Sequence, residues 1–288
     1  MAPCLTACSR TTPAAMTELL QYEFMRNALW ACLLISINCG IIGTLVVVNR
    51  LVFLSGGIAH ASYGGVGVAL FCGLPPQLGA AGCAIAASMA MGMISLHAKH
   101  RSDTIIGVVW ATGMAAGIVL VDLTPGYHVD LMSYLFGSIL MVPGYMLWLM
   151  AGLDVFVVAW AFLFYRQIQA MSYDEEHAQV MGVPVQGLYF ALLGLTALSV
   201  VMVIQAVGLI LVIALLTVPA VIAEDFSRSL RAMMCWAVLL SMVFTMVGLV
   251  VSYFFDLTAG ATIVLVAAAV FFIFRIILGM YKGWRARQ

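Results

Sequence analysis

The sequence predicts an all-α protein, a polytopic transmembrane helical bundle of about nine spans, with eight to ten as the range. Of its 288 residues, 65% are hydrophobic and only 8% are charged, whereas a soluble domain carries about 25% charged residues. The apolar residues come in blocks of about 20, the length that crosses the hydrocarbon core of a bilayer. Basic residues fall mainly between alternate blocks, as in the inner loops of membrane proteins. These three observations indicate a multi-pass membrane protein.

The chain begins with a polar leader over residues 1–26, which lacks the apolar stretch of a signal peptide. Because this leader resembles no structural element, Met16 is an alternative start. The membrane domain is predicted over residues 27–280, and a basic cytoplasmic tail follows over residues 281–288. The predicted spans cover residues 28–48, 58–72, 78–96, 104–121, 145–165, 185–203, 206–223, 233–253 and 259–277.

Three of these spans are unusual. The second is short and rich in glycine. The sixth and seventh are nearly fused, and Gln205 and Gly208 offer the only visible break between them. We expect two helices here because the combined apolar stretch is far longer than one membrane crossing needs.

The basic residues predict the orientation. With the N-terminus outside and the C-terminus cytoplasmic, inner segments hold ten of the 12 basic residues, and only Arg10 and Arg26 fall outside, in agreement with the positive-inside rule. The outer loops then carry acidic residues that could attract cations, although exposed loop charges can simply be solvated; these are Asp122, Asp130 and Asp256, with His128 among them. The net charge is zero, so nothing suggests a nucleic-acid partner, and none is expected.

His60, in the second span, is the first candidate functional residue. An ionisable group at membrane depth is costly and usually faces a protein interior or a pathway. Gly57, Ala61, Gly65 and Ala69 recur every fourth residue around it, which predicts a helix face that a neighbouring backbone can approach closely. The alternative is that His60 only forms a hydrogen bond between helices.

The inner segment 172–183 is too polar to span the membrane. Ser172 or Asp174 can cap a short helix there, with acidic residues in its first turn and Gly182 at its end. By composition alone, an ordinary connecting helix is the favoured interpretation.

Nucleotide-binding and catalytic signatures are missing from the sequence. There is no G-x-x-x-x-G-K-[ST] phosphate loop, and the only lysines are Lys99 and Lys282. No H-E-x-x-H or G-x-S-x-G pattern occurs either. The chain is therefore not expected to be an enzyme, and if ATP drives transport, another chain must supply the ATPase.

Several segments, in order along the chain, resemble the ABC-3 permeases, the membrane subunits of zinc-, manganese- and iron-type ABC importers. Residues 54–70 resemble the family's histidine helix, L-S-D-x-x-S/A-H-A-x-x-x-G, and residues 173–183 resemble its F-D-E-x-x-A-x-x-x-G-V coupling segment. Each match is weak alone, but together they cover most of the chain. The other matching segments are residues 102–120, 134–140, 208–223 and 256–265.

The resemblance implies a permease in a bacterial plasma (inner) membrane, within the lipid bilayer. Its implied partners are cytoplasmic ABC ATP-binding subunits, an extracytoplasmic metal-binding protein and a second copy of itself. It implies no permanently bound cofactor, only a divalent metal ion in transit. His60 stands where the family has its pathway histidine, and four residues stand in the coupling segment: Asp174, Glu175, Ala178 and Gly182.

One position departs from the family pattern. The family usually has aspartate four residues before the histidine, whereas this chain has Gly56. Positions i and i+4 share a helix face, so an Asp/His pair would offer a divalent ion one oxygen and one nitrogen ligand. Here the oxygen ligand is missing, and Ser55, an outer carboxylate or the second subunit are the candidates to replace it.

Three interpretations remain open on the residues. The first is a permease for zinc, manganese or ferrous iron. The second is a secondary transporter or channel that uses His60 as an ion or proton site; it is weakened by the scarcity of intramembrane carboxylates, which proton relays favour. The third is an intramembrane enzyme, for which no nucleophile–base pair is visible.

Overall fold

The computed structural model describes residues 23–97, 102–124, 137 and 139–285. In these ranges every regular element is a helix, so the predicted all-α class is confirmed. The elements are α3 (Glu23–Val48), α4 (Val52–Phe71), α5 (Pro76–His97), α6 (Ser102–Asp122), the 3-10 helix η2 (Ile139–Met141), α8 (Gly144–Leu163), α9 (Tyr165–Tyr173), α10 (Glu175–Val180), α11 (Val185–Val207), α12 (Leu209–Phe226), α13 (Leu230–Phe255) and α14 (Ala259–Arg285).

The predicted span count agrees with the structure. Within the described ranges, 8 helices are long and apolar enough to cross a membrane. Helix α4 is not among them, but it is 20 residues long and lies among them, so counting it restores the predicted nine. The short second span was wrong: the helix begins at Val52, six residues before the predicted start. Glycines such as Gly56 and Gly57 look like helix breakers in water, but membrane helices use them freely.

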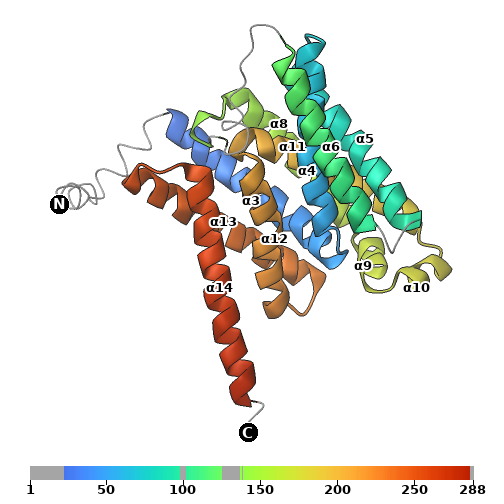
Figure 1. Cartoon of the computed structure of the whole chain (residues 1–288). Helices are drawn as coiled ribbons and strands as arrows, with labels where there is room; N and C mark the ends of the chain where they lie inside the picture. Colours follow the sequence, from blue (N-terminus) through green and yellow to red (C-terminus); the bar gives the residue numbers. More distant parts are fainter. Residues whose placement is uncertain (1–22, 98–101, 125–136, 138, 286–288) are drawn as a thin grey trace.

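Both ends of the predicted membrane domain shift slightly. The last residues of the predicted leader, from Glu23, already belong to α3, and residues 281–285 of the predicted tail continue α14. The rest of the leader and of the tail lies outside the described residues. Figure 1 shows α14 extending away from the other helices toward the C-terminus.

Helix α3 is the centre of one part of the bundle. It packs against α8, α12 and α13, while α4 packs mainly against α5 and α6, and α11 contacts both parts through α3, α4 and α5. In Figure 1, α4, α5 and α6 run side by side. The bundle is therefore made of two helix groups that share α11.

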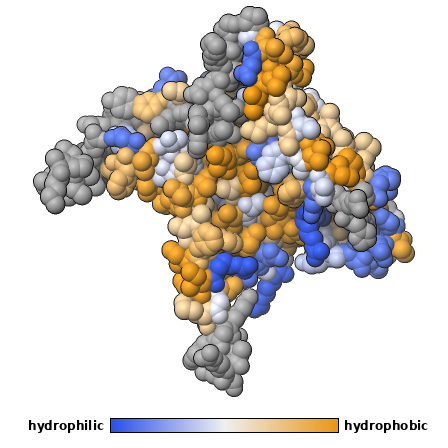
Figure 2. Space-filling view, viewed as in Figure 1, coloured by the Kyte–Doolittle hydropathy of each residue, from blue (hydrophilic) through white to orange (hydrophobic). Residues whose placement is uncertain are grey.

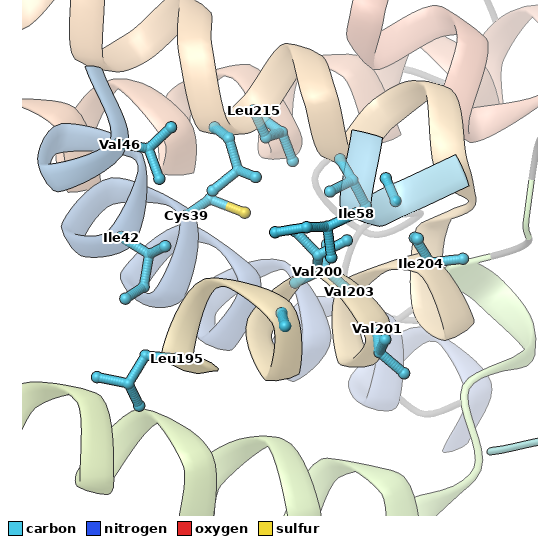
Figure 3. Close-up of a cluster of buried hydrophobic side chains, with 14 of the residues drawn as sticks. Cys39, Ile42, Val46, Ile58, Leu195, Val200, Val201, Val203, Ile204 and Leu215 are labelled. Carbon is cyan, nitrogen blue, oxygen red and sulfur yellow. The ribbon is translucent and has the colours of Figure 1, made fainter. Parts of the chain in front are cut away.

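The core lies where the two groups meet. Ile58 of α4 is fully buried, as are Ile42 of α3 and Leu215 of α12, and Figure 3 shows them among valines and Ile204 of α11. The outer surface is also apolar, as Figure 2 shows, with residues such as Trp148 and Phe162 exposed. An apolar exterior is expected of helices that face lipid.

The predicted small-residue face of α4 is a packing seam. A Cβ atom added at Gly65 would fall on the backbone carbonyl oxygen of Gly79 in α5, and one added at Gly64 would lie 2.8 Å from the carbonyl oxygen of Gly113 in α6. One added at Gly113 would lie 3.1 Å from the Cα of Ala61. Both neighbours therefore approach α4 at backbone distance, as small residues allow.

The predicted break between the sixth and seventh spans is confirmed. Helix α11 ends at Val207 and α12 begins at Leu209, with Gly208 between them at φ +84°. That backbone conformation strongly favours glycine. Gly137, also at positive φ, packs directly against the backbone of Gly208, so two glycines meet at this turn.

Candidate functional site

His60 lies near the middle of α4 and is half buried. Its ring stacks on the indole of Trp110 in α6, with centroids 4.1 Å apart and an interplanar angle of 21°. Its Nδ1 atom is buried and has no hydrogen-bond partner among the described residues. Buried ring nitrogens normally have partners. The stack holds the ring while this nitrogen stays available, an arrangement that suits a ligand more than a structural hydrogen bond.

Trp110 was not identified from the sequence. It lies 50 positions after His60 in an apolar span, where a tryptophan normally packs against core or lipid. No local pattern connects the two residues. Only the close approach of α4 and α6 along their glycines brings the rings together.

Gly56, one turn before His60, is buried but not crowded. A Cβ atom there would meet only Cδ1 of Ile213, at 4.0 Å, which is ordinary contact with the end of a flexible side chain. The adjacent Gly57 differs, because a Cβ there would lie 2.8 Å from Cγ2 of Ile106. Packing therefore requires glycine at position 57 but leaves room for a side chain at position 56.

The predicted acidic outer residues are not brought together into a metal centre. Asp122 is the last residue of α6, Asp256 ends α13 in the left-handed conformation at φ 51°, and both are exposed. Asp130 and His128 lie outside the described residues. Across the described ranges, no three His, Cys, Asp or Glu side chains are grouped to hold a metal ion.

The inner segment forms a capped helix. Asp174 is the N-cap of α10, and its Oδ1 accepts a hydrogen bond of 2.9 Å from the backbone N–H of His177. Glu175 lies in the first turn, where a negative charge complements the helix dipole, and Ala178 is buried. Gly182 follows the helix at φ +80°, as predicted for its end.

The alternative prediction, that Ser172 caps the short helix, is wrong. Ser172 belongs to the preceding helix α9, and its hydroxyl contacts Oδ1 of Asn49 at 3.3 Å. The predicted segment 172–183 is thus the end of α9, a six-residue α10 and a turn. The carboxylate is the stronger cap because it is charged and the first turn is electropositive.

An open cavity of about 580 Å³ lies beside α10. Glu175, Glu176 and Gln179 line it together with His97 at the end of α5 and Gln186 at the start of α11. Figure 2 shows hydrophilic residues gathered at the end of the molecule where Figure 1 places α9 and α10. This end therefore offers an acidic, water-accessible face, in contrast to the apolar surface of the spans.

A second intramembrane ionisable residue was not identified from the sequence. Asp154 lies in α8, is 5% exposed, and its Oδ1 accepts a hydrogen bond of 2.9 Å from Nδ2 of Asn38 in α3. A carboxylate in the middle of an apolar span was itself a sufficient signal. Its partner Asn38 could not be predicted, because 116 residues separate the two.

Comparison with known sequences decides the family. A sequence model of the ABC 3 transport family matches residues 21–278, which is nearly the whole membrane domain. The chain belongs to this family. The resemblance found in the motifs is thereby confirmed: the chain is a membrane transport subunit and not an enzyme, and it belongs in a bacterial inner membrane.

Individual relatives agree along their full lengths. An uncharacterised membrane protein of Synechocystis sp. is 51% identical over 265 residues, covering 92% of this chain and 94% of the relative. The manganese transport system membrane protein MntC of Halalkalibacterium halodurans is 32% identical over 278 residues, covering 94% of this chain and 95% of the relative. Both similarities include the histidine helix and the inner segment.

A solved structure shows the same fold. A chain of PsaBC from Streptococcus pneumoniae, in complex with a Fab, superimposes with a TM-score of 0.81 at 30% identity, covering 90% of this chain and 93% of that one. The fold described above is therefore shared with that chain.

Proposed function

We propose that this ABC 3 permease is the membrane subunit of an ATP-driven importer of divalent transition metal ions. The observation that carries the proposal is His60, a half-buried imidazole held by Trp110 with an unpartnered Nδ1 atom, at the family's pathway position. The names of the manganese transport relative and of other relatives, such as a metal transport system membrane protein of Chlamydia trachomatis, support the substrate class.

The proposed partners are those that membership of the family implies. The sequence contains no phosphate-binding loop, which is consistent with ATP being bound and hydrolysed by two separate cytoplasmic subunits. The capped helix α10 and its acidic cavity are the face that would dock on them, with Gly182 allowing the turn that follows. An extracytoplasmic metal-binding protein delivers the ion to the outer face, and a second copy of this chain completes the pathway.

His60 contributes one ligand and no more. A stable transition-metal site in a protein usually has about four ligands, and no three candidate ligands are grouped in the described part of this chain. The remaining ligands come from the second copy, from outer acidic residues or from water. A site with so few protein ligands passes an ion along rather than storing it, so the metal is cargo and not a resident cofactor.

Gly56 affects which ion is preferred. Carboxylate oxygens suit manganese, whereas imidazole suits zinc and iron. Among the three candidates, the relatives' names favour manganese, but the absence of a carboxylate at position 56 weakens the discrimination in its favour. We therefore propose manganese as a substrate that competes with zinc and ferrous iron at this site.

Replacement of His60 tests the proposal directly. In cells that express the complete complex, His60→Ala should abolish metal uptake, because the chain loses its ligand, while the complex still assembles with its ATPase. Cys235→Ala is the control, since Cys235 is exposed on α13, which packs against α3, α12 and α14, and should leave uptake unchanged. Normal uptake by a well-expressed His60→Ala variant would exclude His60 from the pathway.

The Gly56→Asp variant tests the ligand face. Because only Ile213 is near a Cβ at position 56, the aspartate should fit and restore an oxygen ligand one turn from His60. Competitive uptake of manganese, zinc and ferrous iron should then shift toward manganese by about tenfold, equivalent to about 1.4 kcal/mol. Gly56→Ala controls for the added volume. Equal selectivity of the wild type and both variants would show that a side chain at position 56 does not contact the ion.

The coupling face has its own test. Gly182→Leu should slow transport without lowering ATPase activity to the same extent, because its positive φ strains any residue with a Cβ atom. Gly187→Leu, in the first turn of α11 with only Pro184 near its Cβ, is the control. A cysteine at position 175 that reacts only with outside reagents would refute the cytoplasmic placement.

A further inference from the structure

Asn38 and Asp154 form an isolated polar pair inside the apolar bundle. Each lies near the middle of its helix, in α3 and α8 respectively. Both are buried, with 3% of Asn38 and 5% of Asp154 exposed. Neither residue belongs to the proposed pathway, which runs along α4.

The pair leaves two acceptors unsatisfied. Nδ2 of Asn38 donates to Oδ1 of Asp154 at 2.9 Å. The other two oxygens, Oδ1 of Asn38 and Oδ2 of Asp154, are buried without any hydrogen-bond partner in the described part of the chain. Two neighbouring acceptors with no donor are costly in a membrane interior, where water cannot replace the missing bonds.

No positive charge compensates the carboxyl group. Helix α8 packs against α3, η2, α9 and α11, and no lysine, arginine or histidine of the described residues forms an ion pair with Asp154. The titratable group that interacts with Asp154 is the Cys39 thiol of α3, which offers no cation. An ionised, unpaired carboxylate at this depth would cost several kcal/mol.

We propose that Asp154 binds a proton on Oδ2 and donates it to Oδ1 of Asn38. The proton comes from water as the helix inserts and remains on the carboxyl group. Together with the bond from Asn38 Nδ2, it closes a ring of two hydrogen bonds between acid and amide. One proton thereby satisfies both orphan oxygens and neutralises the charge, and the ring clamps α3 to α8.

The proton also has an electrical consequence. A carboxylate fixed in the membrane would attract any cation that crosses nearby. A protonated Asp154 offers no such charge, so the clamp holds the helices without adding a cation site within the membrane. This inference rests on the Asn38–Asp154 geometry and stands whether or not the substrate is a metal ion.

Infrared difference spectroscopy detects the proton. We compare the purified permease complex with its Asp154→Asn variant at neutral pH, in H₂O and in D₂O. The difference spectrum should contain the carbonyl stretch of a carboxylic acid, and this band should move in D₂O. Loss of carboxylate stretches in its place would show that Asp154 is ionised and would overturn the proposal.

Thermal unfolding of the same complex provides a second test. Asparagine at position 154 can form the same two hydrogen bonds with Asn38, so Asp154→Asn should keep the wild-type midpoint. Asp154→Ala and Asn38→Ala should each lower it by roughly 2–6 °C. Thr196→Ala, which removes a buried hydroxyl bonded only to its own helix, controls for lost volume.

The alternative occupant is a monovalent cation held by the two orphan oxygens. In that case sodium or potassium chloride would raise the wild-type midpoint above its value in choline chloride, and Asp154→Asn would unfold as readily as Asp154→Ala. Either result would overturn the proton assignment. Salt-independent midpoints and a stable Asp154→Asn variant support it.

Discussion

Helices α4, α5 and α6 touch one another through glycine backbones. Helix α3 also approaches α13 closely at Gly40, but it adds side-chain hydrogen bonds to α8 and a hydroxyl contact to α13. In the first group, Gly65 lies against the backbone of Gly79. In the second, Asn38 donates to Asp154, and the Ser36 and Thr245 hydroxyls lie 3.2 Å apart. Apolar burial cannot favour helix association in lipid as it does in water, so close packing and polar contacts replace it.

The difference matters because His60, the candidate site, lies in α4, which packs against α5 and α6 through glycines. Where two backbones are in contact, the helices cannot shift without losing packing, so adding even one methyl group there should lower stability strongly. A hydrogen bond between helices in a membrane is worth only about 0.6 kcal/mol on average. Backbone contacts at glycine and hydrogen bonds between side chains should therefore respond very differently to substitutions of similar size.

The largest effect is expected from Gly65→Ala. The added methyl group would fall on the Gly79 carbonyl oxygen and on Cβ of Cys83, so α4 and α5 must separate, and the free energy of unfolding should drop by about 3 kcal/mol. The thermal unfolding midpoint and the yield of monodisperse protein measure the loss.

The control for this substitution lies on the partner helix. A Cβ atom at Gly82 of α5 has nothing within 4 Å, so Gly82→Ala should be neutral or slightly stabilising, because alanine is the better helix former. If both alanine variants unfold alike, backbone contact does not hold this group together.

A smaller effect is expected from Trp110→Leu. The stack on His60 contributes about 1 kcal/mol beyond burial, and without it the imidazole can turn away from the ion. We expect metal uptake to fall about fivefold, by the usual conversion of free energy to rate, with little loss of folded protein. Trp148→Leu, in the exposed face of α8, is the matched control and should keep normal uptake; equal activity of the two variants would mean that the stack does not position His60.

The smallest effect is expected from Thr245→Val. Valine keeps the shape but removes the hydroxyl that contacts Ser36 across the α3–α13 contact, so the free energy of unfolding should fall by about 0.6 kcal/mol. Thr196→Val, whose hydroxyl bonds only to Leu192 of its own helix, should change stability less. A loss as large as that of Gly65→Ala would contradict the ranking of glycine backbone contacts above side-chain hydrogen bonds.

The sequence predicted features that depend on local composition. Blocks of apolar residues revealed the spans because the bilayer sets their length, and Gly208 marked a real break between α11 and α12. The start of α4 was misplaced because Gly56 and Gly57 look like a turn when only local propensity is considered. Asp154 was overlooked, although a charge within a span is visible in the sequence.

Contacts between distant residues could not be predicted in this way. The stack of His60 on Trp110 and the bond from Asn38 to Asp154 join helices whose faces are set by the whole bundle. Half of the candidate site was therefore predictable: the ionisable residue and the capped inner helix with Asp174. The stack of Trp110 on His60 and the open space at Gly56 became visible only in the three-dimensional structure.

Helix α14 fixes how deeply the permease sits in its membrane. Its 27 residues span about 40 Å at 1.5 Å per residue, about 10 Å more than the hydrocarbon core. Arg275 lies about 24 Å along the helix from Ala259, pairs with Asp225 at 3.5 Å and is followed by apolar residues 276–278. An outward displacement of the helix would move this guanidinium deeper into the hydrocarbon, which is costly. Arg275 therefore opposes outward displacement of α14.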